Sequence, residues 1–427
     1  MTFSTISVIG LGYIGLPTAA MFAAYGKKVI GVDVNVETVN TINGGGIHFV
    51  EPELDAIVQN VVSNGSLRAV VKPEPAEAFL IAVPTPFIPD QSTGGRPEAD
   101  LNYIREASIA ISAVLKKGDL VILESTSPVG TTEKMADWLA QCRKDLTFPA
   151  THGEQADIRI AHCPERVLPG RVVIELVEND RVIGGLTEKC SLLARDLYKV
   201  FVRGECYLTN ARTAEMAKLT ENAFRDVNIA FANELSMICD EINVDVWELI
   251  RLANRHPRVD ILKPGPGVGG HCIAVDPWFI VSKTPEQAKL IHTARKINDA
   301  KPSWGIEKIK NSVIEFLKNN IDRSVKDIVI ACYGITFKPD IDDLRESPAL
   351  DIALTISTLH PGEVLTVEPN INKKSIKDNR INLVDLQFAI NKADIHIILV
   401  DHKEFLSLRL EQLHGKTVID IKGVLSQ

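Results

Sequence analysis

Short apolar runs rich in β-branched residues alternate with helical stretches along the first two-fifths of the chain. These runs cover residues 6–9, 28–32, 79–83, 120–123 and 158–162. A second rhythm of the same kind follows near the C-terminus, at residues 328–332, 363–367, 394–400 and 417–421. Strands that alternate with helices are typical of parallel βαβ units. The pattern therefore predicts an α/β protein with two domains of this kind.

A long helical period separates the two α/β regions. From about Asn210 to Ile238, apolar residues recur at steps of three to five positions. At about 1.5 Å per residue, a helix of that extent spans about 40 Å, which is long enough to bridge two domains. Glycine and proline then cluster in residues 264–270, and their density predicts a close-fitting loop. We expect boundaries near residues 205 and 320, which divide the chain into residues 1–205, 206–320 and 321–427.

Composition and charge narrow the class of protein. The 427 residues include 47 Lys and Arg against 55 Asp and Glu, a net charge of −8 that argues against a nucleic-acid partner. The seven cysteines are scattered and form no C-x-x-C pair, so neither a disulfide framework nor a metal site is expected. No apolar run is long enough to span a bilayer, and the first residues lack the cationic start of a signal peptide. We therefore expect a cytoplasmic protein without a membrane partner.

A glycine-rich turn follows the first predicted strand. The segment Gly10-Leu-Gly-Tyr-Ile-Gly15 matches the G-x-G-x-x-G pattern and opens a helical stretch. In this pattern the glycines provide a tight turn, room for a pyrophosphate and close helix packing, while the helix N-terminus attracts the phosphates. Asp33 follows the second predicted strand and is placed to accept both hydroxyls of an adenosine ribose. Because a carboxylate repels a 2′-phosphate, the sequence favours NAD over NADP.

Two more predicted strands end in small polar turns. These turns are Val83-Pro-Thr-Pro86, which contains Thr85, and Glu124-Ser-Thr-Ser-Pro-Val-Gly130, which contains Thr126. Ligands of doubly wound sheets bind at the carboxyl ends of the strands. Thr85 and Thr126 are therefore candidate neighbours of a cofactor or substrate, although ordinary turn chemistry explains the same residues.

Cys272 is the candidate nucleophile. It follows Gly269-Gly-His271, and paired glycines let the backbone approach a ligand closely. An exposed cysteine in such a loop can act as a thiolate, whereas a buried cysteine packs as a small hydrophobic residue. His271 is either an activating base or a histidine that packs in the loop.

Two further places carry candidate polar groups. Lys218 and Asn222 are four residues apart on the predicted long helix, so both side chains can address one developing oxyanion. A solvated helix face explains the same spacing, because Glu221 and Arg225 form a similar pair. Glu165 follows another predicted strand, where a carboxylate serves either as a catalytic base or as a helix cap.

Together these residues resemble a known family, the UDP-glucose/GDP-mannose dehydrogenases, which are NAD-dependent enzymes acting on nucleotide sugars. The resemblance extends over essentially the whole chain and implies two Rossmann-like, doubly wound domains joined by a long central helix. The N-terminal domain would bind NAD, the C-terminal domain would bind the UDP part, and the central helix would build a homodimer. The matching segments are 10–15, 83–86, 125–126, 164–165, 215–222, 269–272 with Asp276, and 337–347.

The resemblance also implies a reaction. Family members oxidise the sugar C6 alcohol to a carboxylate in two hydride transfers, through a thioester on a cysteine that corresponds to Cys272. Lys218 and Asn222 would then stabilise the oxyanion.

The remaining roles concern hydrolysis and binding. By the resemblance, Asp276 and Thr126 hold a catalytic water and Glu165 assists thioester hydrolysis. The implied cofactor-binding residues are Gly10, Gly12, Tyr13, Ile14, Gly15, Asp33, Thr85, Thr126 and Arg345. The implied substrate-binding residues are Arg166, Val167, Leu168, Lys218, Asn222, Arg258, Gly269, Phe337 and Lys338.

One position departs from the UDP-glucose branch of the family. Where those enzymes carry a second glutamate four residues after the first, this chain has Pro169, so hydrolysis would depend on Glu165 or on water held by Asp276. The segments 164–170, 255–258 and 264–278 resemble the acetamido-sugar branch. That branch implies UDP-N-acetyl-D-mannosamine as substrate and a product used for surface polysaccharides such as enterobacterial common antigen. UDP-N-acetylglucosamine and UDP-N-acetylgalactosamine are alternatives, because motif spacing does not reveal an epimer.

Two more distant alternatives share only the dinucleotide loop. A two-electron hydroxyacid dehydrogenase has the same nucleotide-binding fold without a need for Cys272. A non-catalytic protein that senses NAD needs neither Cys272 nor the Lys218 and Asn222 pair.

Overall fold

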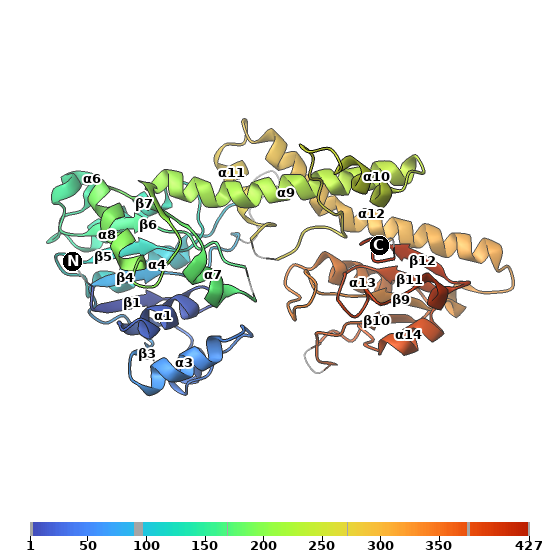
Figure 1. Ribbon diagram of the computed structural model, residues 1–427, viewed down its shortest axis with the longest axis horizontal. Helices are drawn as coiled ribbons and strands as arrows, with labels where there is room; N and C mark the ends of the chain where they lie inside the picture. Colours follow the sequence, from blue (N-terminus) through green and yellow to red (C-terminus); the bar gives the residue numbers. More distant parts are fainter. Residues whose placement is uncertain (1–2, 89–96, 169, 271, 374–375, 426–427) are drawn as a thin grey trace. The chain divides into compact units, whose positions relative to one another are not determined.

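The computed structural model describes residues 3–88, 97–168, 170–270, 272–373 and 376–425. The chain forms two compact units, Met1–Glu221 and Asn222–Gln427. Figure 1 labels most of their helices and strands. The 31-residue helix α9 (Ala211–Glu241) begins in the first unit and ends in the second.

The first unit is built on one sheet with strand order β3-β2-β1-β4-β5-β6-β7-β8. Neighbouring strands pair in parallel, except that β6 and β7 are antiparallel. Chain order runs outward in both directions from β1 and β4, which is the doubly wound arrangement. The strands are β1 (Thr5–Ile9), β2 (Lys28–Val32), β3 (Leu67–Val70), β4 (Ala78–Ile81), β5 (Leu120–Leu123), β6 (Arg159–His162), β7 (Arg181–Gly185) and β8 (Cys206–Asn210).

Helices cover both faces of this sheet, because its central strands are apolar on both sides. In β4, Ala78 and Leu80 enter one core cluster, whereas Phe79 and Ile81 enter the other. Helices α1 (Gly15–Ala24), α3 (Leu54–Ser63), α7 (Val172–Glu178) and α8 (Glu188–Tyr198) pack in the first cluster. Helices α4 (Asn102–Ser112) and α5 (Thr131–Cys142) pack in the second. Helix α2 (Val36–Asn43) adds Val39 and Ile42 to the first cluster, and the four-residue helix α6 (Pro149–His152) precedes β6.

The second unit contains a smaller parallel sheet with strand order β10-β9-β11-β12. Its strands are β9 (Ile330–Tyr333), β10 (Val364–Val367), β11 (Ile395–Ile398) and β12 (Thr417–Asp420). Helices α12 (Lys289–Asn319) and α13 (Pro348–Leu359) share one core cluster with this sheet, and α14 (Leu386–Lys392) shares the other. The sheet is therefore covered on both faces, as a parallel sheet requires. The helices α10 (Val246–Ala253) and α11 (Asp276–Lys283) belong to the same unit.

Buried polar contacts join α9 to α12 within the second unit. The guanidinium of Arg295 pairs with Asp226 at 2.6 Å, and both side chains are almost fully buried. Asn298 donates to the same carboxylate at 2.8 Å, and Asn233 donates to Asn298 at 2.9 Å. Asn233 also accepts a hydrogen bond from the backbone of Gly265, 2.9 Å away. These two helices thus fix the start of the glycine-rich loop that carries Cys272.

The predicted fold class, two Rossmann-like doubly wound domains joined by a long central helix, is confirmed. The nine predicted strands are all present, with ends shifted by a few residues. The sequence did not predict β3, β7 and β8. These strands are interrupted by arginine, glycine or polar residues, and β3 and β8 form the edges of the sheet, where burial is incomplete.

Within the described residues, none of the helices combines the length and the apolar character needed to cross a membrane.

Candidate active site

The dinucleotide loop lies between β1 and α1, as predicted. Gly10 has a φ of +91°, and a Cβ at this position would lie 2.6 Å from the carbonyl oxygen of Ala82. A Cβ on Gly15, the first residue of α1, would lie 1.8 Å from the carbonyl oxygen of Gly10. A Cβ on Gly12 would meet no atom of the described residues within 4 Å. The loop is thus closed on its protein side and open at Gly12, and the positive end of the α1 helix dipole there favours phosphates.

The two residues between Gly12 and Gly15 complete the turn. The ring of Tyr13 stacks on that of Phe49 with 4.3 Å between centroids. Ile14 occupies the N-cap position of α1.

Asp33 follows β2 and is tied to the same loop. Its Oδ2 accepts a hydrogen bond from the backbone N–H of Leu11 at 3.0 Å, and its Oδ1 accepts one from Asn35 at 2.8 Å. Each carboxylate oxygen keeps a second lone pair for a ligand hydroxyl. Burial lowers the pKa of nearby His48, while the charge of Asp33 acts in the opposite direction. Asp33 therefore has a structural role in addition to the predicted contact with ribose. The loop and the helix start fit the pyrophosphate of NAD, and this carboxylate fits its adenosine ribose.

The turns after β4 and β5 lie side by side. The hydroxyl of Thr85 donates to the backbone carbonyl of Thr126 at 2.7 Å. The hydroxyl of Ser125 donates to the carbonyl of Val83 at 2.6 Å. The structure thus brings together two predicted site residues, Thr85 and Thr126, at the carboxyl edge of the sheet.

Glu165 follows β6 and is buried, with 7% of its surface exposed. Its carboxylate pairs with the guanidinium of Arg181 at 2.8 Å, a residue that the sequence did not single out. Arg166 pairs with Glu221 of α9 at 2.5 Å, so Glu221 has a partner other than the expected Arg225.

The residues that follow Glu165 differ in exposure. Val167 is half-buried against the core, whereas Leu168 is exposed. Pro169 lies outside the described residues.

Asn222 and Asp276 meet beside the cysteine loop of the second unit. The amide of Asn222 donates to the carboxylate of Asp276 at 2.5 Å, and both side chains are buried. The backbone N–H of Asp276 donates to the carbonyl of Cys272 at 2.9 Å. The side chain of Cys272 is exposed, and His271 lies outside the described residues. Lys218 is half-buried on α9, one helical turn before Asn222.

The glycine-rich loop packs directly on the segment that follows β9. A Cβ on Gly269 would lie 2.3 Å from the carbonyl oxygen of Glu346 and 2.8 Å from Cβ of Phe337. Gly270 has a φ of +80°, and its Cβ would lie 2.9 Å from the ring of Phe337. The loop that leads to Cys272 therefore requires glycine at both positions, because a side chain there would displace Phe337.

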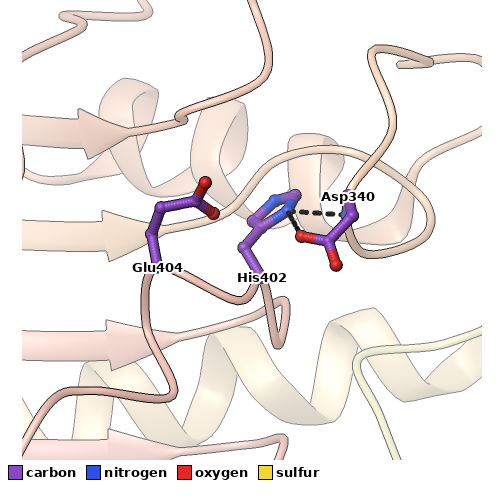
Figure 2. Close-up of side chains that lie close together, drawn as sticks. All are labelled: Asp340, His402 and Glu404. Carbon is purple, nitrogen blue, oxygen red and sulfur yellow. Dashed lines mark hydrogen bonds and ion pairs between the residues drawn. The ribbon is translucent and has the colours of Figure 1, made fainter.

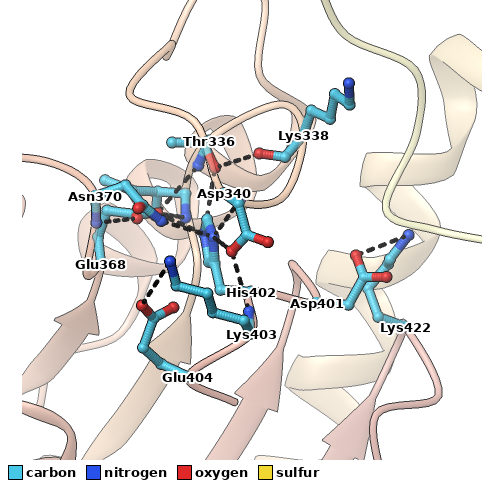
Figure 3. A network of polar contacts seen from close by, with 11 residues as sticks. Thr336, Lys338, Asp340, Glu368, Asn370, Asp401, His402, Lys403, Glu404 and Lys422 are labelled. Carbon is cyan, nitrogen blue, oxygen red and sulfur yellow. Dashed lines mark hydrogen bonds and ion pairs between the residues drawn. The ribbon is translucent and has the colours of Figure 1, made fainter. Parts of the chain in front are cut away.

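A buried hydrogen-bond network holds the loop that carries Phe337 and Lys338 (Figure 3). Glu368, at the end of β10, accepts backbone hydrogen bonds from Ile335 at 2.8 Å and Thr336 at 3.3 Å. The hydroxyl of Thr336 in turn donates to the carbonyl of Lys338 at 2.9 Å. The conformation of this predicted substrate-binding loop is thus set by a buried carboxylate on the neighbouring strand.

His402, at the end of β11, closes the network and is fully buried. Its Nδ1 accepts the backbone N–H of Asp340 at 3.0 Å, so its Nε2–H is the group that faces Glu368 at 3.1 Å. Figure 2 shows His402 between Asp340 and Glu404, three side chains whose oxygen and nitrogen atoms approach one another as metal ligands would. Both ring nitrogens already have protein partners. We therefore interpret this group as part of the hydrogen-bond network.

Two predicted ligand contacts lie at the surface of the second unit. Arg345 is paired with its neighbour Asp343 at 2.5 Å. Arg258 is exposed in the segment after α10. Lys338, a third predicted ligand contact of this unit, is half-buried.

A doubly wound sheet with a glycine turn after its first strand and an acid after its second is typical of an NAD-binding domain. The UDP-glucose/GDP-mannose dehydrogenase family provides models for three successive parts of the chain. Its NAD binding domain matches residues 4–202, its central domain residues 212–300 and its UDP binding domain residues 331–427. The chain belongs to this family, and NAD is its cofactor.

Curated relatives match over nearly the full length of the chain. The UDP-N-acetyl-D-mannosamine dehydrogenase of Yersinia pestis is 60% identical over 426 residues, which cover 99% of this chain and 100% of the relative. The NDP-N-acetyl-D-galactosaminuronic acid dehydrogenase of Ralstonia nicotianae is 58% identical, covering 99% of this chain and 97% of the relative. Among solved structures, a UDP-D-ManNAc dehydrogenase from Pyrococcus horikoshii matches with a TM-score of 0.85 and 39% identity, over 99% of this chain and 96% of that one.

Proposed function

We propose that this enzyme oxidises the C6 alcohol of UDP-N-acetyl-D-mannosamine to the carboxylate of UDP-N-acetyl-D-mannosaminuronate. The observation that supports this proposal best is the pair of buried groups, Asn222 and Asp276, beside the exposed Cys272. A simple alcohol dehydrogenase needs no nucleophilic cysteine, whereas an oxidation that continues to the acid does. The substrate is proposed from the full-length similarity to the Yersinia enzyme.

The reaction consumes one water and two NAD and forms a carboxylate, two NADH and three protons. NAD, when bound, accepts one hydride in each oxidation. After the first, the Cys272 thiolate adds to the aldehyde carbon, and loss of the second hydride leaves a thioester. Lys218 and the amide of Asn222 stabilise the negative charge on the C6 oxygen.

Hydrolysis releases the product. Water attacks the thioester carbon, the carbon–sulfur bond breaks, and Cys272 leaves as the thiolate. We assign the proton of that water to Glu165, and we assign the holding of the water to Asp276 and Thr126. Lys338 and Phe337 would bind the nucleotide sugar on the second unit.

A second substrate has support from the Ralstonia relative, whose name specifies a galactosaminuronic acid and whose identity to this chain is 58%. UDP-N-acetylgalactosamine and UDP-N-acetylglucosamine would undergo the same chemistry at C6. The epimers differ in one hydroxyl or amide orientation, which buried hydrogen-bonding groups discriminate well.

An NADH assay across these three UDP-acetamido sugars tests the proposal. We expect the highest kcat/KM with UDP-N-acetyl-D-mannosamine and two NADH per sugar. One NADH per substrate would instead indicate a two-electron dehydrogenase. Turnover of none of the sugars would overturn the proposed function.

We further propose a cytoplasmic homodimer whose product feeds surface polysaccharide synthesis of the enterobacterial common antigen type. The dimer is supported by three exposed apolar residues of α9 that recur every seven positions. They are Phe224, Phe231 and Ile238, which are 68%, 54% and 50% exposed. Residues seven apart lie on one face of a helix, so these three form a continuous apolar stripe.

A further inference from the structure

A chain of buried polar contacts begins at Glu165 in the first unit. One carboxylate oxygen of Glu165 pairs with the guanidinium of Arg181 at 2.8 Å, and only 6% and 4% of the two side chains is exposed. The other oxygen accepts the backbone N–H of Arg166 at 2.6 Å. One oxygen is thus held by a hydrogen bond and the other by an ion pair without hydrogen-bond geometry, and both contacts restrict the orientation of the carboxylate.

The antiparallel strand β7 explains why Arg181 is there. His162 of β6 pairs with Gly184 of β7. Continuing that register past the end of β6 brings residue 165 opposite residue 181. A parallel β7 would begin at the opposite edge of the sheet, so its reversed direction places the first residue of β7 at the carboxyl edge beside Glu165.

Other elements of the unit hold Arg181 in turn. Its guanidinium lies over the ring of Tyr198, at the end of α8, 4.7 Å from the centroid. It also donates to the carbonyl of Leu176 in α7 at 3.4 Å. The hydroxyl of Tyr198 donates to Glu124, the residue after β5, at 2.6 Å. Arg181 therefore stands between two buried carboxylates, Glu165 and Glu124.

The charges of this cluster are unequal in number. Burial first, and the charge of Glu165 second, raise the pKa of Glu124 to about 7, although Arg181, Tyr198 and Thr18 of α1 act to lower it. Burial also raises the pKa of neighbouring Cys163 to about 12, so that thiol stays neutral. With one guanidinium for two carboxylates, Glu124 is the residue that takes up a proton near neutral pH. The positive charge of Arg181 is then available to Glu165.

We propose that Arg181 is a positioning residue for Glu165, and that Tyr198 and Glu124 hold Arg181 in place. The inference rests on the proposed hydrolytic role of Glu165. Activation of water requires a carboxylate that is ionised and aimed in one direction. The guanidinium of Arg181, 2.8 Å from the carboxylate, pairs with its negative charge and restricts its orientation, and we assign Arg181 no contact with the substrate.

The test is the variant Arg181→Gln in the full-length enzyme. Rapid-quench mass measurement follows the covalent intermediate on Cys272, and steady-state assays follow kcat as a function of pH. We expect kcat to fall at least about tenfold, because hydrolysis slows, and the covalent intermediate to accumulate. The acid limb of the kcat profile should move to higher pH, because a buried carboxylate without a counter-charge takes up a proton more readily. Arg181→Lys keeps a positive charge, so it should recover part of the wild-type kcat and part of the wild-type pH profile. An unchanged acid limb with no accumulated intermediate would overturn the proposal.

Two further variants distinguish the loss of positioning from a general loss of structure. Tyr198→Phe keeps the ring over Arg181 and removes only the hydroxyl, so we expect the same two effects in weaker form. If this variant folds and shows neither effect, the role of Tyr198 and Glu124 is overturned. The matched control is Arg295→Gln, which removes another buried guanidinium that pairs with a carboxylate, that of Asp226. It should lower the thermal midpoint without moving the acid limb, and an equal shift of that limb would overturn the proposal.

Glu165→Gln separates this inference from the proposed function. Hydrolysis at the wild-type rate in that variant would overturn the role of Glu165 and this inference with it. Slow hydrolysis in Glu165→Gln together with an unaffected Arg181→Gln would overturn this inference alone.

Discussion

Cys272 lies in a loop that leaves little freedom to its neighbours. Two glycines before it have no room for a side chain against Phe337, and the backbone of Asp276 bonds back to its carbonyl. The thiol itself is exposed. A substitution confined to the sulfur should therefore change chemistry more than structure.

Cys272→Ser should stop the reaction before the acid is released. A serine hydroxyl is a weaker nucleophile than a thiolate, and an alkoxide is a poorer leaving group, so kcat should fall at least about a hundredfold. Counting NADH per sugar and measuring the mass of the protein checks this expectation. Cys142→Ser is the control, because Cys142 is also exposed but lies on α5 of the first unit. Two NADH per sugar at the wild-type rate in Cys272→Ser would contradict the nucleophilic role.

Asp33 combines two effects that one substitution does not separate. Its carboxylate accepts the N–H of Leu11 in the dinucleotide loop and would also repel a 2′-phosphate. Asp33→Ala removes both, so the KM for NAD should rise and the preference for NAD over NADP should fall.

Asp33→Asn separates these effects, because the amide keeps an acceptor for Leu11 but loses the charge. We expect a smaller rise in the KM for NAD and a similar loss of preference. The measurement is kcat/KM for both cofactors in all three proteins. Equal use of NAD and NADP by the wild type would show that Asp33 does not set cofactor choice.

At the scale of elements, α9 presents Lys218 and Asn222 one turn apart, and the amide of Asn222 bonds to the buried carboxylate of Asp276. Preorganised donors at a developing oxyanion typically contribute about 3 kcal/mol, so Lys218→Ala should lower kcat about a hundredfold with a nearly unchanged Kd for the UDP-sugar. Lys338→Ala should weaken binding instead, since Lys338 is expected at the nucleotide. Stopped-flow kinetics and equilibrium titration distinguish the two. A raised Kd with preserved kcat in Lys218→Ala would make Lys218 a binding residue.

The loop after β9 depends on the ends of β10 and β11. His402→Ala removes the acceptor for Asp340 and the donor facing Glu368, which leaves buried polar groups without partners. One such unsatisfied group costs about 1–3 kcal/mol, and about 1.4 kcal/mol corresponds to a tenfold change in Kd. The Kd for UDP should therefore rise about tenfold. The Kd for NAD should stay the same, since the dinucleotide loop belongs to the first unit. Titrations with UDP and NAD check this, with exposed His414→Ala as the control. An unchanged Kd for UDP would show that the loop holds its conformation without His402.

These elements also show what can be read from a sequence. The central strands of both sheets are buried on two faces and therefore appear as continuous apolar runs, which made them predictable. Thr85 and Thr126 were singled out by the rule that ligands bind at the carboxyl ends of parallel strands, whereas the hydrogen bond between them was not predicted. Arg181 was not predictable, because its position depends on the direction of β7, and a short run of valine, isoleucine and glycine does not reveal direction. The predicted domain boundaries near residues 205 and 320 remain a prediction.

At the scale of the whole molecule, the apolar stripe of α9 needs an explanation. Phe224, Phe231 and Ile238 are exposed by half or more in the isolated chain. Exposing three such side chains in one row is unfavourable, since burial of a large apolar side chain stabilises by about 1.5–3 kcal/mol. A second copy that packs its own stripe on this one would remove both rows from water, as a twofold interface allows.

Phe231→Glu places a negative charge at the centre of that stripe. In a twofold dimer the two introduced carboxylates, one from each copy, would lie close together. Desolvation and like-charge repulsion should then shift the assembly toward monomers, so the apparent mass in sedimentation velocity should fall about twofold at micromolar concentration. Phe388→Glu is the matched control, because Phe388 of α14 is also exposed, by 44%, but lies outside the stripe. The control should sediment like the wild type. A wild-type mass for Phe231→Glu would mean that α9 does not form the interface, and a monomeric wild type would exclude the dimer altogether.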